Sequence, residues 1–182
     1  MRQVRVRHGS AAELRTRSVL LGLLDSFDLA PWTFTDELVI DDHGWPHSHP
    51  VLTLDVAAAD DPELLLAAFV HEQLHWFEEQ HAQRRDAFVG ATVEHYPDVP
   101  NARPEGAGDE ASTRLHLLVC HLELRVLATV LGPVAARRLV TRLSEHHYRW
   151  IYRTVLQDRA TLTGMVKRHG LVPAGLASGT AS

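Results

Sequence analysis

The stretch 60-DDPELLLAAFVHEQLHWFEEQHAQ-83 is the most clearly helical segment of the chain, and the rest of the fold is predicted around it. It begins with acidic residues that can cap a helix N-terminus, and Pro62 occupies the first helical position, where a missing N–H is no loss. No helix breaker follows for about five turns. We therefore predict one long helix here.

Two histidines lie on this helix, with a glutamate directly after the first. His71 and His75 are four residues apart, so they share one face and can both direct a ring nitrogen at one ion. Glu72 is rotated from His71 by about 100° and would lie beside such an ion, where it can accept a proton from water. Leu64 and Ala68 continue the stripe of the two histidines, which indicates a core-facing site. Two histidines without a metal are the alternative.

A third metal ligand must come from another segment, because a catalytic zinc typically has three protein ligands and one open position. The segment 110-EASTRLHLLVCHLELRVLATVLG-132 is predicted to be a helix that stops at Gly132, and it contains His116, His121 and Glu123. His116 and Glu123 share one face, whereas His121 is turned away from it. Because His116 and Glu123 are about 10.5 Å apart along the helix axis, they cannot easily bind the same ion.

Glu123 is the favoured third ligand. It lies mid-helix among leucines and a valine, and a buried carboxylate needs a counter-charge such as a metal ion. A salt bridge with Arg125 or another arginine is the alternative for Glu123. His116 could then donate to an oxyanion or to the substrate, while a ligand role or simple packing near the helix start are its other interpretations.

The sequence resembles the zincin metallopeptidases, in the branch whose third zinc ligand is a glutamate on a later helix. The resemblance rests on HEQLH at 71–75, on LLVCHLELRVL at 117–127, and on the order strand, motif helix, loop, ligand helix. It covers about residues 50–130. It implies a Zn²⁺-dependent hydrolase with Glu72 as general base, a peptide or protein substrate, and the strand VLTLDV at 51–56 near the substrate cleft.

One position departs from that branch. Such zincins often carry an acidic residue one turn after the glutamate ligand, where it holds a zinc-binding histidine, but this chain has Leu127. Another group must then orient His71 or His75. The candidates are Glu78, Glu79 and Asp109.

A small sheet is predicted early in the chain. Residues 3-QVRVR-7 are typical of a short strand, and 37-ELVIDDHGWPHSHPVLTLDVA-57 contains two β-rich runs separated by Gly44 and Pro46. We expect those two runs to pair as antiparallel strands. Together with the helices, they predict a predominantly helical α+β fold, zincin-like, with the metal site between two helices.

The remaining segments are predicted from their caps and breakers. A helix is expected from Ser10, as N-cap, to about Leu24, and two or three helices over 133–170. Residues 89–109 are rich in Pro, Gly and Asn and are predicted to form a long loop. Within it, EHYPDVP at 94–100 could cover the cleft as a lid or be an inert connector.

Further histidines and tyrosines allow either a functional or a structural interpretation. His43, His47 and His49 surround Trp45 and could form a second metal site, although an exposed polar loop is the favoured interpretation. A later helix carries tyrosines four residues apart, which could stabilise an oxyanion but are favoured as core packing. These are Tyr148 and Tyr152.

The composition is that of a globular protein of about one domain. The chain has 182 residues, of which 45% are hydrophobic, enough to bury a sizeable core. Its formal net charge is −5 and its basic residues are spread along the sequence, so we expect no nucleic-acid partner. We predict a single domain over residues 1–174, followed by a flexible tail over 175–182.

Cysteine usage and hydropathy bear on the compartment. Cys120 is the one cysteine, which excludes an intramolecular disulfide and a thiolate-rich zinc site and fits a reducing environment. The apolar run 18-SVLLGLLDSF-27 is short and interrupted by Asp25, so we expect neither a signal peptide nor a membrane span. A cytoplasmic protein is expected.

The favoured function is therefore a zinc-dependent hydrolase, most simply a peptidase or amidase. One alternative is a metal-binding scaffold or regulatory protein of zincin fold that hydrolyses nothing. Another is a non-haem iron enzyme, because two histidines and a carboxylate can also bind iron. The glutamate after the first histidine favours hydrolysis, since an oxygenase would not need a base at that position.

Overall fold

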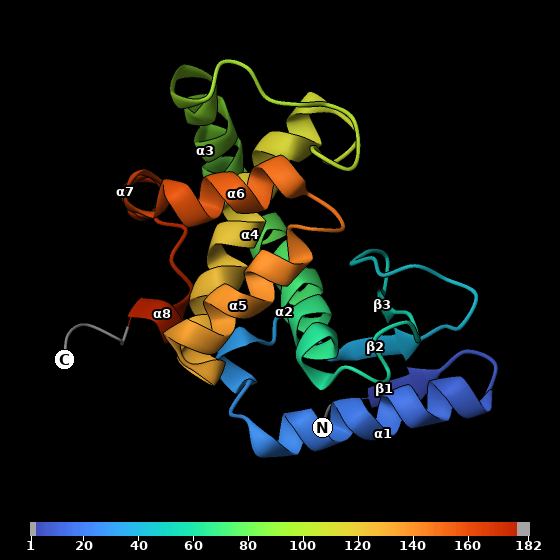
Figure 1. Ribbon diagram of the computed structural model, residues 1–182. Coiled ribbons are helices and arrows are strands. Elements are labelled where there is room, and N and C mark those ends of the chain that lie inside the picture. Colours follow the sequence, from blue (N-terminus) through green and yellow to red (C-terminus); the bar gives the residue numbers. More distant parts are fainter. Residues whose placement is uncertain (1–2, 178–182) are drawn as a thin grey trace. The chain divides into compact units, whose positions relative to one another are not determined.

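The computed structural model describes residues 3–177, which form a predominantly helical α+β structure with one small sheet, as predicted (Figure 1). The chain divides into two compact units, residues 1–77 and 78–182. The boundary between them falls inside the motif helix α2 (Pro62–Glu79), and each unit is described by itself. The single domain over 1–174 stays a prediction. Within the described range, no helix combines the length and apolar character needed to cross a membrane.

The sheet of the first unit contains three strands in the order β1-β2-β3, and both pairs are parallel. The antiparallel pairing expected for the second and third strands is therefore wrong. Strands β2 and β3 are buried on successive residues rather than on alternate ones, a pattern typical of parallel sheets, which are covered on both faces. Their bounds are β1 (Gln3–Val6), β2 (Glu37–Ile40) and β3 (Leu52–Leu54).

The connection between β2 and β3 explains why the sequence suggests antiparallel pairing of these two strands. Gly44 and Pro46 suggest a hairpin turn. Residues 41–51, however, are about long enough for the crossover connection that two parallel strands need. His47 in this connection and Thr53 in β3 form an isolated antiparallel bridge with two backbone hydrogen bonds of 3.0 and 2.8 Å. The local sequence thus has hairpin character, although the two strands it joins run in the same direction.

Helix α1 (Ala11–Ser26) connects β1 to β2 and packs against both strands (Figure 1). It begins with a capping box in which Ser10 Oγ accepts from Glu13 N, and Glu13 Oε2 accepts from Ser10 N. The fully buried Glu13 side chain also accepts from the backbone N–H groups of His8, Gly9 and Asp42. One carboxylate therefore joins the segment after β1, the start of α1 and the segment after β2.

Helix α4 is the centre of the second unit, where it contacts α3, α5, α6 and α7 (Figure 1). Asp109 caps its N-terminus by accepting from Ser112 N at 2.7 Å. It ends at Gly132, whose φ of +87° suits a residue without Cβ, and Pro133 then begins α5. The bounds are α3 (Ala82–His95), α4 (Glu110–Leu131), α5 (Pro133–Leu143), α6 (Arg149–Gln157), α7 (Arg159–Arg168) and α8 (Ala174–Ala177).

Two boundaries differ from the prediction. The first part of the expected loop over 89–109 is the end of α3, so the loop itself covers only 96–109. Gly90 suggested the loop, but it occupies an exposed position in the helix, which the flanking turns support. Residues 175–177 of the expected tail belong to α8, and 178–182 lie outside the described residues.

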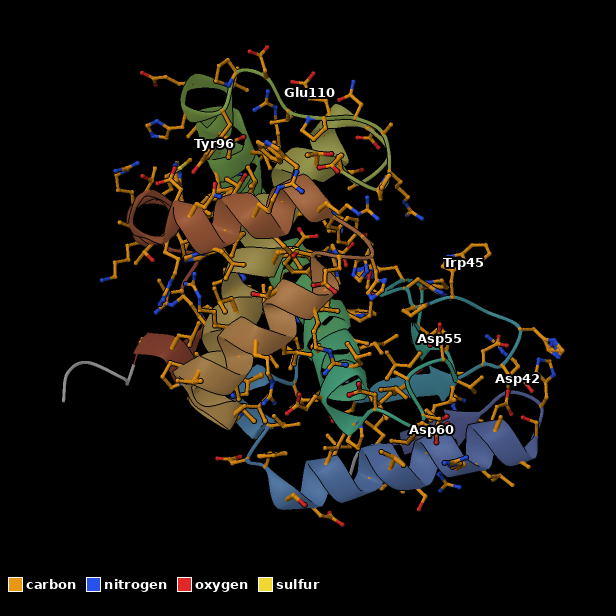
Figure 2. All side chains as sticks on the ribbon, in the orientation of Figure 1. Asp42, Trp45, Asp55, Asp60, Tyr96 and Glu110 are labelled. Atoms are coloured by element: carbon orange, nitrogen blue, oxygen red, sulfur yellow. The ribbon has the colours of Figure 1, made fainter. Side chains whose placement is uncertain are left out.

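The loop over 96–109 is held by many hydrogen bonds. Arg114, only 3% exposed, donates to the carbonyl oxygens of Tyr96 and Pro97 at 2.9 and 3.3 Å. Carbonyl oxygens of Pro104 and Glu105 accept from the first backbone N–H groups of α6, at 2.9 and 3.2 Å. Figure 2 shows Tyr96 and Glu110 at the two ends of this segment. These contacts favour an ordered connector over a lid.

Candidate metal centre

The two motif histidines lie together on α2, as their spacing predicts. The helix starts where the Asp61 carboxylate accepts from Leu64 N at 3.1 Å. One helical turn separates His71 from His75, and their ring centroids are 5.1 Å apart. A ring nitrogen of His71 lies within 4.8 Å of a ring nitrogen of His75. His71 and Glu72 are buried, and His75 is partly exposed. The pair can converge on one ion with small side-chain adjustments.

Neighbouring side chains fix the rotation of α2 within the first unit. Gln73, which lies inside the motif, accepts from the backbone N–H groups of Phe34 and Thr35 at 2.6 and 3.0 Å and donates to the Thr35 carbonyl at 3.0 Å. Trp76 Nε1 donates to the Ser48 carbonyl at 2.9 Å. Because Gln73 is about 200° from His71 around the helix, these bonds direct the histidine away from the segments that Gln73 and Trp76 hold.

His116, on α4, has a defined tautomer. Its Nδ1 lies 2.7 Å from the Ser112 carbonyl oxygen, which can only accept, so Nδ1 carries the hydrogen. In the neutral ring, Nε2 then carries the lone pair. This is the arrangement common for metal-bound histidines, whose other ring nitrogen donates to a carbonyl or carboxylate. The ring also packs against Tyr148, with centroids 4.5 Å apart.

Glu123 is buried in the second unit, on the face of α4 that meets α6. Tyr152 donates its hydroxyl hydrogen to Glu123 Oε2 at 3.0 Å, and Cys120 offers its sulfur within 4.8 Å of a Glu123 carboxylate oxygen. Burial, reinforced by Cys120 and Glu123, raises the pKa of the Tyr152 hydroxyl well above its ordinary value. Burial and Glu123 likewise raise the pKa of the Cys120 thiol. Both groups therefore stay protonated at neutral pH.

The salt bridge considered for Glu123 is not made by Arg125. Among the described residues, Arg125 Nη1 has no hydrogen-bond partner. Arg125 instead lies near His121 and Arg159, whose charges affect one another. His121 Nε2 is 3.3 Å from Thr163 Oγ1 on α7, so this histidine faces a different neighbour from Glu123, as the helical spacing predicts. Burial, with both arginines, lowers the pKa of His121 to about 3, and the ring is neutral.

Two of the residues considered for orienting a zinc-binding histidine have other partners. Glu78 Oε2 accepts from Arg85 at 2.9 Å, and Asp109 caps α4. Tyr152 is buried in the core, as predicted, and its hydrogen bond to Glu123 is an additional contact that the sequence does not reveal. The signal was the i, i+4 spacing of Tyr148 and Tyr152, which does not by itself identify a polar partner.

The predicted site residues thus fall into two groups, one in each unit. His71, Glu72 and His75 lie on α2 in the first unit, and His116 and Glu123 lie on α4 in the second. Comparison of the chain with protein-family models, with curated proteins and with solved structures found no match. The chemistry of these side chains therefore carries the functional argument.

Proposed function

We propose that this chain is a zinc-dependent hydrolase of peptide or amide bonds, with His71 and His75 as ligands and Glu72 as general base. The observation that supports it is the pair of ring nitrogens within 4.8 Å on one turn of α2, with Glu72 next in sequence and buried. Neutral imidazole nitrogens are preferred zinc ligands. The peptide or protein substrate and the zincin-like fold belong to the same proposal.

The metal ion and the side chains have separate roles in the proposed reaction. When bound, zinc would supply Lewis acidity, polarising a carbonyl and lowering the pKa of water. Glu72 accepts the proton of the attacking water and passes it to the leaving nitrogen. The hydrogen bonds of Gln73 hold the motif helix in one rotation, so that the base keeps its position through the reaction.

Glu123 is the proposed third ligand, and Tyr152 would orient it by donating to one carboxylate oxygen. The tautomer of His116 supports the other choice, because its Nε2 can bind a metal while Nδ1 donates to Ser112. A role for His116 as a donor to the substrate requires the protonated ring, since the neutral ring already uses its N–H. Zinc sites with three histidines and with two histidines and a glutamate are both established types.

The test of the mechanism is Glu72→Gln. This variant keeps the shape of the side chain and removes the base, so we expect full zinc content and a loss of hydrolysis of about 10²–10⁴-fold. Hydrolysis is followed on a diverse peptide library, and metal content by elemental analysis, which also distinguishes zinc from iron. Retained turnover would sink the mechanism, and an inactive wild type with full zinc content would support the scaffold alternative.

The test of the third ligand compares His116→Gln with Glu123→Gln in protein loaded with cobalt. Loss of the ligand should change the visible cobalt spectrum and weaken binding, whereas loss of the other residue should leave the spectrum unchanged. His121→Gln is the matched control, because His121 lies on the same helix and faces Thr163. The proposed assignment predicts the change for Glu123→Gln, and a change only for His116→Gln would assign the three-histidine set.

A further inference from the structure

A second cluster of metal-binding side chains lies in the first unit, on segments separate from α2. His8 follows β1, and Asp42 and His43 follow β2. These segments meet at the start of α1, because parallel strands end at the same edge of the sheet. Figure 2 shows Asp42 beside the first turn of α1. The three side chains offer ligand atoms that all lie within 4.8 Å of one another.

The distances suit one ion. His43 Nε2 is 3.4 Å and His8 Nε2 is 4.0 Å from the same oxygen, Asp42 Oδ1. Ligand atoms at about 2.0–2.2 Å from a tetrahedral zinc are roughly 3.3–3.6 Å apart, so one distance fits and the other needs a shift of a few tenths of an ångström. The two rings are 4.8 Å apart and nearly perpendicular, with an interplanar angle of 80°.

Asp42 Oδ1 is the least satisfied atom of the cluster. It is shielded from solvent and makes no hydrogen bond to any described residue. The Asp42 backbone cannot easily move to relieve this, since its N–H donates to the buried Glu13 carboxylate at 3.2 Å. An ionised oxygen without a donor is costly, and a cation held by that oxygen would remove the cost.

The neighbouring Asp41 has a different role. Its Oδ1 accepts from His43 N at 2.9 Å, and its Oδ2 accepts from Arg7 at 3.3 Å, so both oxygens are engaged. Its Oδ1 also lies 3.5 Å from His8 Nε2. Asp41 therefore holds the loop backbone and Arg7, leaving Asp42 Oδ1 as the carboxylate ligand.

We propose that His8 Nε2, His43 Nε2 and Asp42 Oδ1 bind a divalent transition-metal ion such as Zn²⁺, with water in the remaining position. Two imidazoles and one carboxylate are a ligand set that such ions accept. The ion ties the segment after β1 to the loop between β2 and β3. This site is independent of the hydrolase proposal, because it shares no residue with it.

The test uses the full chain with His71→Ala and His75→Ala, which removes the proposed motif site. Zinc titration of this variant, followed by calorimetry, should give one equivalent bound. His8→Ala or His43→Ala added to it should weaken binding by at least about tenfold. His47→Ala is the matched control from the same loop, since its Nδ1 is 2.8 Å from the Trp45 carbonyl oxygen, and it should leave binding unchanged.

Nitrogen NMR of the imidazole rings gives a second measurement that needs no further substitution. Zinc added to the His71→Ala, His75→Ala protein should shift the Nε2 resonances of His8 and His43 and leave that of His47 in place. No zinc-dependent shift of His8 and His43, or equal loss of binding in the His47→Ala variant, would overturn the proposal.

Discussion

Buried polar side chains do much of the positioning in this chain, one residue at a time. Gln73 uses both ends of its amide to hold two successive backbone positions, and Arg114 holds the loop that precedes its own helix. Such residues are hard to recognise in a sequence, because a glutamine or arginine inside a helical pattern is more often exposed. The motif glutamate and histidines were recognised because their chemistry depends on local spacing alone.

The hydrogen bond between Tyr152 and Glu123 should be measurable as a coupling energy. Tyr152→Phe removes the donor and leaves a buried carboxylate oxygen short of one bond, so we expect a loss of about 1–3 kcal/mol in the free energy of unfolding. A double-mutant cycle with Glu123→Leu, which removes the acceptor, followed by urea unfolding of the metal-free protein, isolates the pair. Strictly additive effects would contradict the interaction.

Gly106 and Gly90 form a matched pair for the effect of one methyl group. A Cβ at Gly106 would lie 2.0 Å from the Pro100 carbonyl oxygen and 2.7 Å from Thr113 Oγ1, whereas a Cβ at Gly90 meets nothing within 4 Å. We expect Gly106→Ala to destabilise the protein by roughly 1–3 kcal/mol. Gly90→Ala, in an exposed helical position, should stabilise it by about 0.5–1 kcal/mol. Thermal unfolding of both variants measures the two changes in stability. Equal changes for Gly106→Ala and Gly90→Ala would refute the prediction.

Among the elements, helices with caps were predictable and strand direction was not. Ser10 and Gly132 identify helix ends because each cap acts within four residues. The parallel pairing of β2 with β3 depends on where a long connection returns, which no local pattern specifies. The end of α3 was missed for a similar reason, since the turns around Gly90 outweigh its low propensity.

The Asp109 cap gives α4 a dependence on pH. Hydrogen bonds from the Ser112 backbone and hydroxyl lower the pKa of Asp109 in the folded state. A lowered pKa means that the stabilisation is complete above the unfolded value of about 3.9 and is lost as the pH falls through the folded value. Asp109→Ala should therefore destabilise the protein at pH 7, and the difference from wild type should shrink near pH 3. Urea unfolding at both pH values measures it; a constant difference would contradict the prediction.

At the scale of the whole molecule, the chain contains two compact units, and the single domain predicted from composition and length stays a prediction. Length cannot distinguish these cases, because 182 residues are enough for one domain or for two small ones. The proposed ligand set takes residues from both units, so metal binding would link their stabilities. Neither unit alone carries the complete set.

This linkage can be tested by hydrogen exchange. With zinc at about 100 times its dissociation constant, the bound state gains about 2.7 kcal/mol, so amide protection should rise in α4 as well as in α2. His71→Ala should abolish the rise in α4, although the substitution lies in the other unit. The wild type without zinc is the reference. A rise confined to α2 would show that α4 contributes no ligand.

The loop over 96–109 has a practical consequence for anyone who engineers this protein. Long loops are the usual sites for inserting a tag, a reporter domain or a new chain terminus. Here the backbone of Pro104 and Glu105 caps α6, and α6 carries the tyrosine that contacts Glu123. A cut or insertion at residues 100–106 would uncap that helix and disturb the candidate site from a distance. The loop over 96–109 should therefore be left intact when this protein is engineered.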